Sequence, residues 1–110
     1  MPEHLISQKQ IDPYYYELLI DTKDPEIVAG LKEPIKAEFR KHGYKTLVLE
    51  EEKQDQLLVS LIALVIKDGG IKVVSTSTQA QDALSFATRK QAELNPSEVS
   101  FASPADSKPD

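Results

Sequence analysis

Alternation of apolar and polar side chains predicts two short β-strands in the first half of the chain. Residues Tyr14–Ile20 are rich in strand-forming types, and successive side chains point to opposite faces. Glu17 falls on the face opposite Tyr14, so we expect that second face to be partly exposed to water. Residues Tyr44–Glu50 repeat the alternation and predict a second strand.

A helix is predicted between these strands. Asp24 followed by Pro25 is a strong helix start, with Asp24 as the N-cap and Pro25 at the first helical position. Apolar residues then recur every four positions, at Ile27, Leu31, Ile35 and Phe39. The pair His42-Gly43 is typical of a helix end. Pro34 lies inside this run, where proline removes a backbone hydrogen bond at a cost of about 3 kcal/mol, so we expect a kink or a break there.

The order strand, helix, strand favours a particular fold class. Short links between such elements form a right-handed βαβ unit, in which the two strands are parallel. We therefore expect an α/β or α+β fold, a small two-layer domain with about two to four strands and two or three helices. The domain is expected over residues 12–94, after an N-terminal extension over 1–11. Residues 95–110 are rich in Pro and Ser, which is typical of a flexible tail.

The most apolar segment runs from Leu57 to Ile66. It is far shorter than the roughly 20 residues that span a bilayer, so we expect no membrane span. Its Leu and Ala content favours a buried helix, which is the interpretation we prefer. The alternative is a strand that pairs with residues 71–76 through a turn at Asp68-Gly69. A further helix is predicted over Thr78–Leu94, with Thr78 as its cap and small apolar residues on its buried side.

Composition excludes several classes of function. The 13 basic and 18 acidic residues give a net charge of −5, which argues against a nucleic-acid binder. The chain has no cysteine, so thiolate metal sites and cysteine nucleophiles are excluded. His4 and His42 are too distant in sequence to suggest a metal site, and the run Ser75–Thr78 lacks the surroundings of a catalytic serine. We expect no enzyme activity, no catalytic residue, no metal and no cofactor.

Apolar contact is the interaction that the sequence favours. A small domain buries only about 60–65% of its unfolded surface, so an all-apolar segment is hard to cover within one chain. We expect a protein partner or a homodimer to contact the most apolar segment and the tyrosine run. The candidate residues are Leu57, Leu58, Leu61, Ile62, Val65, Tyr14 and Tyr15. The N-terminus lacks a basic region followed by an apolar run, so cytoplasmic residence is expected.

Two alternatives use carboxylates instead. Glu50, Glu51, Glu52 and Asp55 form an acidic patch with which the chain would inhibit a nucleic-acid enzyme, or another target, by occupying its basic site. The weaker alternative is a metal-dependent hydrolase that holds a hard cation with Asp21, Asp24 and Glu50.

The order of elements also resembles a known family. A strand ending Leu-Ile-Asp-Thr-Lys-Asp-Pro-Glu, the run 56–66 and the pair Gly69-Gly70 are similar to the effector-associated constant component domains of bacterial conflict systems. The likeness covers about residues 14–101, and Phe86 and Arg89-Lys90 stand where that family has a Trp-Leu pair and an Arg-rich end. The resemblance implies a non-enzymatic adaptor between a signal and an effector.

Overall fold

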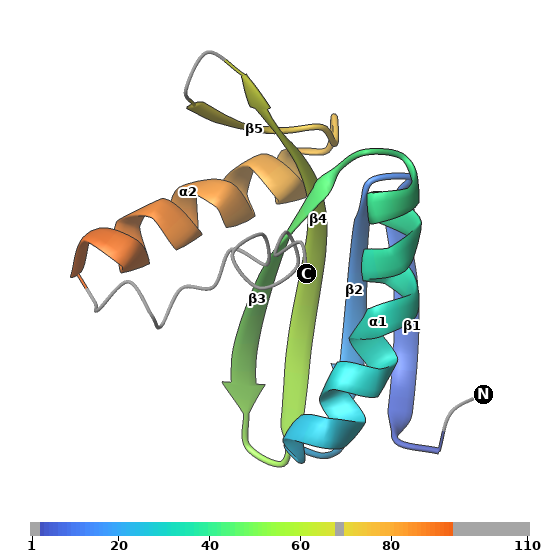
Figure 1. The fold of residues 1–110 in the computed structure, drawn as a ribbon. Coiled ribbons are helices and arrows are strands. Elements are labelled where there is room, and N and C mark those ends of the chain that lie inside the picture. The colour runs from blue at the N-terminus through green and yellow to red at the C-terminus, as the bar shows by residue number, and fades with distance from the viewer. Residues whose placement is uncertain (1–2, 68–69, 94–110) are drawn as a thin grey trace.

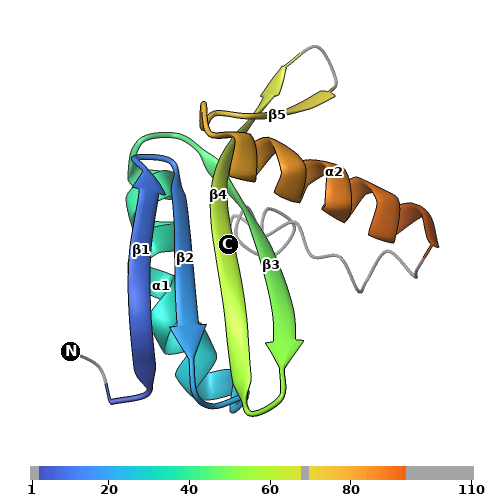
Figure 2. The ribbon, with the colours of Figure 1, turned by 180° about the vertical axis from the view of Figure 1, so that it is seen from behind.

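The computed structural model describes residues 3–67 and 70–93, which form a five-stranded sheet and two helices (Figures 1 and 2). In chain order the elements are β1 (Leu5–Asp12), β2 (Tyr15–Ile20), α1 (Pro25–Lys41), β3 (Lys45–Lys53), β4 (Gln56–Lys67), β5 (Gly70–Val73) and α2 (Thr78–Glu93). Residues 95–110, expected to be a flexible tail, lie outside the described residues. Residues 5–11, expected to belong to an extension, form most of β1 and are part of the sheet.

The sheet corrects the expected fold class. Its strand order is β1-β2-β4-β3, and β5 also pairs with β4. Every neighbouring pair in the described sheet is antiparallel. The expected α/β fold built on a βαβ unit was therefore wrong, as was the expectation of at most four strands. Strands β2 and β3 do run in the same direction, because each is antiparallel to β4, but they are not neighbours. Helix α1 does connect β2 to β3, but β3 turns back through a two-residue hairpin at Gln54–Asp55, and this places β4 between them.

The apolar run 57–66 is a strand, so the preferred helix was wrong and the hairpin alternative is confirmed. Strand β4 pairs with β2 on one side, with β3 on the other, and with β5 through Lys67 opposite Gly70. Most of its side chains from Leu57 to Leu64 are buried, because both faces of this central strand are covered. Burial on both faces explains why the segment is apolar at every position except Ser60, rather than at alternate positions. Tertiary packing overrides the helix propensity of Leu and Ala.

Helix α1 has the predicted ends but no break. Asp24 Oδ1 accepts a hydrogen bond of 2.9 Å from the Glu26 backbone N–H, which confirms the N-cap. Gly43 follows the helix with φ +84°, a conformation that glycine adopts without strain. One helix runs from Pro25 to Lys41 with Pro34 inside it, so the expected break was wrong. Both Pro34 and Gly30 are exposed, so water can hydrogen-bond the carbonyl that proline leaves without its helical partner.

The two helices lie on opposite faces of the sheet. The α1 face buries Phe39 and Ile35 against Leu18, Val59 and Leu61. On the other face Ala80, Ala83 and Leu84 of α2 pack on a smaller cluster that contains Tyr15, Leu47 and Ile62. Both views show α2 near the β5 end of the sheet and projecting outward past β3. No helix in the described part of the chain is long and apolar enough to cross a bilayer.

Candidate functional site

The residues predicted to contact a partner form part of the core of this single chain. Leu57, Leu61, Ile62 and Tyr15 are each at most 5% exposed. Tyr14 is half-buried, and its ring meets that of Tyr44 edge to face at a centroid distance of 5.4 Å. Of the predicted set, Leu58 and Val65 also keep part of their surface exposed.

The buried tyrosine carries a polar tip. Tyr15 donates a hydrogen bond of 2.7 Å from its hydroxyl to Glu17 Oε2. Burial, together with the hydrogen bond to Glu17, raises the pKa of Tyr15 to about 12. The carboxylate thus gives the phenol the hydrogen-bond acceptor that a buried tyrosine needs.

The predicted acidic patch is divided between the two faces of β3. Glu50 Oε2 lies 2.9 Å from Lys32 Nζ on α1, and Glu52 Oε1 lies 3.4 Å from Lys23 Nζ. Glu51 points to the opposite face because side chains alternate along a strand. Two of the carboxylates are therefore paired within the chain, which leaves less acidic surface for a basic target.

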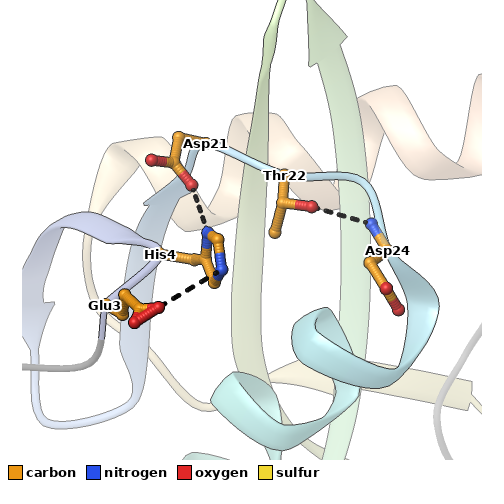
Figure 3. Close-up of polar contacts among 5 residues, drawn as sticks. All are labelled: Glu3, His4, Asp21, Thr22 and Asp24. Carbon is orange, nitrogen blue, oxygen red and sulfur yellow. Dashed lines mark hydrogen bonds and ion pairs between the residues drawn. The ribbon is translucent and has the colours of Figure 1, made fainter.

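A histidine and two carboxylates meet where β1 begins and β2 ends (Figure 3). His4 Nδ1 lies 2.9 Å from Asp21 Oδ1, while Nε2 of the same ring lies 4.0 Å from Glu3 Oε1. The Asp21 backbone N–H also donates to the His4 carbonyl at 3.0 Å. No sequence pattern indicates this pairing, because it depends on β1 lying beside β2.

This cluster is not arranged to hold a metal. The two carboxylates contact opposite nitrogens of the ring, so the three side chains do not converge on one point. Asp24, which the hydrolase alternative requires, caps α1 instead of joining Asp21 (Figure 3). No group of three or more His, Cys, Asp or Glu among the described residues could hold a metal ion.

A second polar cluster joins the first hairpin to the start of α2. Ser75, which is 2% exposed, donates a hydrogen bond from Oγ to Asp12 Oδ2. Asp12 also accepts from the Tyr14 backbone N–H at 2.8 Å. Ser77 Oγ accepts from the Ala80 N–H at 3.0 Å, so Ser77 rather than the predicted Thr78 caps α2. These contacts satisfy buried polar groups and have the character of a structural cap.

On the face of the sheet opposite α1, one end is less covered than the other. On the face opposite α1, Leu19 of β2 lies directly across from Leu58 of β4. Both are partly exposed, whereas their neighbours on the α1 face, Leu18 and Leu57, are 0% and 5% exposed. The difference arises because α2 packs near the β5 end of this face and leaves the other end open (Figure 2). We call the part of the sheet around Leu19 and Leu58 the open face.

The outer edge of β3 borders the open face. Ala63 of β4 donates its N–H to the Tyr14 carbonyl and accepts from the Val74 N–H, so both of its backbone groups point away from β3. Thr46, which lies opposite Ala63, must then direct its own backbone groups outward. Alternation along the strand gives the same outward direction to the backbone groups of Val48, Glu50 and Glu52. No strand in the described sheet pairs with this edge.

Comparisons with known proteins found no relative of this chain. A scan against family models, a search of curated proteins and a search of solved structures each found no match.

Proposed function

We propose that this chain is a non-enzymatic protein-protein interaction module of the cytoplasm that binds its partner through the open face. The observation that carries the proposal is the partial exposure of Leu19 and Leu58, two aliphatic side chains that face each other on neighbouring strands. Their removal from water favours binding by about 25 cal/mol per Å² of apolar surface. A role in a bacterial conflict or signalling system rests on the family resemblance alone.

Charged residues border the open face. Glu51 of β3 lies across from Leu58, and Lys9 of β1 lies across from Glu17. An apolar centre with a charged rim is the usual composition of a protein interface. The acidic-inhibitor alternative is less favoured, because Lys32 and Lys23 already pair with two of its carboxylates.

The experiment is retrieval of binding proteins from the native host by the immobilised chain. We expect a protein that the wild type retains and that both Leu19→Gln and Leu58→Gln lose. Ile71→Gln is the matched control, because Ile71 is 41% exposed and lies on β5, at the other end of the sheet from Leu58, so this variant should retain the partner. Circular dichroism verifies that the variants fold. Retention of the same protein by both folded leucine variants, or no retention by the wild type, would overturn the proposal.

A further inference from the structure

We propose that one partner of this chain is a second copy of itself, joined by antiparallel pairing of the two β3 edges. The inference deepens the proposed function and rests on it, because it names an occupant for the open face. It is carried by three features of β3: its regularity, the charges on one of its faces, and the position of α2 beside it.

Strand β3 is the more regular of the two outer strands in the β1-β2-β4-β3 order. It pairs with β4 over nine consecutive residue pairs with no register shift. Strand β1 has register shifts at both ends, and Lys9 is exposed at its centre. Bulges and a central lysine are features that protect an edge from added strands, and β3 lacks both.

The outward backbone groups restrict the register of such a pairing. Hydrogen-bonded pairs must form between residues whose backbone groups point outward, namely Thr46, Val48, Glu50 and Glu52. Centring the pairing on Val48 places Val48 opposite its own copy and Thr46 opposite Glu50. Thr46 and Val48 are only 3% and 7% exposed in the single chain, whereas Glu50 is exposed. Pairing therefore starts from the Glu50 end and needs a local opening at Val48 and Thr46.

Charges favour this register over the neighbouring one centred on Leu49. With Val48 at the centre, Lys45 of each copy lies opposite Glu51 of the other, and Leu47 lies opposite Leu49. Shifting the centre to Leu49 would place Lys45 opposite Lys53, and like charges directly opposite each other destabilise a sheet. Among the described residues neither Lys45 nor Glu51 has an ion pair within its own chain, whereas Glu50 does. The β3 edge is thus self-complementary in charge.

The same pairing covers the open face. Helix α2 projects past β3, and no strand of the described sheet lies beneath its outer half in either view (Figures 1 and 2). The pairing has a twofold axis perpendicular to the sheet, because Val48 meets its own copy. This axis places the α2 of each copy over the other copy's sheet, at the end where Leu58 lies. One contact therefore extends the sheet and shields the apolar side chains.

The test is a charge exchange followed by light scattering across a range of concentrations. The wild type should form dimers. Lys45→Glu alone and Glu51→Lys alone should each weaken dimerisation by about tenfold or more, because two like-charged pairs replace two opposite ones. An equimolar mixture of the two variants should dimerise like the wild type, since each copy then supplies the opposite charge. Lys53→Glu is the control, because it makes the same charge change as Lys45→Glu on the same face but outside the predicted pairs.

Each possible result tests either the second copy as partner or the register of the pairing. A wild type that stays monomeric, single variants that dimerise normally, or a mixture that stays monomeric would overturn the second copy as partner. Loss of dimerisation in Lys53→Glu would trace the effect to net charge and would overturn the register. None of these results bears on binding of a different protein, which the Leu19 and Leu58 variants test separately.

Discussion

Thr46 lies directly opposite Ala63 on the neighbouring strand, and Ala63 points both of its backbone groups the other way. This arrangement arises because β5 continues the line of β2 along the far side of β4. On that side the Tyr14 carbonyl accepts from the Ala63 N–H, and the Val74 N–H donates to the Ala63 carbonyl. The outer side of β3 therefore holds backbone donors and acceptors that no described strand uses. Side-chain patterning alone does not reveal which residues these are.

Pro34→Ala should stabilise the protein. The substitution restores a backbone N–H that can bond the Gly30 carbonyl within a helix that already runs through this position. Removing an interior helical proline gains about 3 kcal/mol, and the greater freedom of the unfolded chain returns up to about 1 kcal/mol. We expect a net increase of about 2 kcal/mol in the free energy of unfolding, measured by urea denaturation. A decrease would mean that the helix is adapted to proline at this position.

Ser75→Ala should destabilise the protein by about 1–3 kcal/mol. The variant leaves the Asp12 carboxylate without the buried hydroxyl that donates to it, and an unsatisfied buried polar group costs this much. Ser85→Ala on the exposed side of α2 is the control and should change stability very little. Equal effects of the two substitutions would show that the link between Asp12 and α2 contributes nothing.

Stability should fall as the pH rises from about 10 to about 12, in part through Tyr15. Its folded pKa of about 12 lies above the ordinary value of 10.0, so the folded state holds the phenol proton more tightly than the unfolded state does. This contribution is complete below pH 10 and is lost through that window. Tyr15→Phe should reduce the alkaline loss, although Tyr16 and Tyr44, whose pKa values are also raised, maintain part of it. Chemical denaturation at stepped pH tests the difference between wild type and variant, and identical slopes would contradict the assignment.

Lys32→Met should have a small effect on stability, at most about 1 kcal/mol. The ion pair with Glu50 is short, but 43% of the Glu50 side chain is exposed and water screens the interaction. The loss should shrink further in high salt, which can be measured by thermal unfolding with and without 0.5 M salt. A salt-independent loss of several kcal/mol would show that the lysine stem, rather than its charge, stabilises the packing of α1 on β3.

Local signals in the sequence determined the two helices and the side-chain alternation of β2 and β3. Asp24, Pro25 and Gly43 set the ends of α1 because capping and left-handed turns depend on a few adjacent residues. The alternation at 14–20 and 44–50 predicted β2 and much of β3 for the same reason. The run 57–66 gave a correct expectation of burial, since an apolar segment of that length avoids water in either secondary structure.

Tertiary structure alone decided the pairing of strands. Whether 57–66 is a helix or a strand depended on β2 and β3, which supply hydrogen-bond partners from distant parts of the sequence. The insertion of β4 between those strands made the sheet antiparallel, a result that no local pattern encodes. The meeting of His4 with Asp21, the division of Glu50 from Glu51, and the open face around Leu58 all follow from that arrangement. Long-range contacts set them, because the same side chains would face other neighbours in any other strand order.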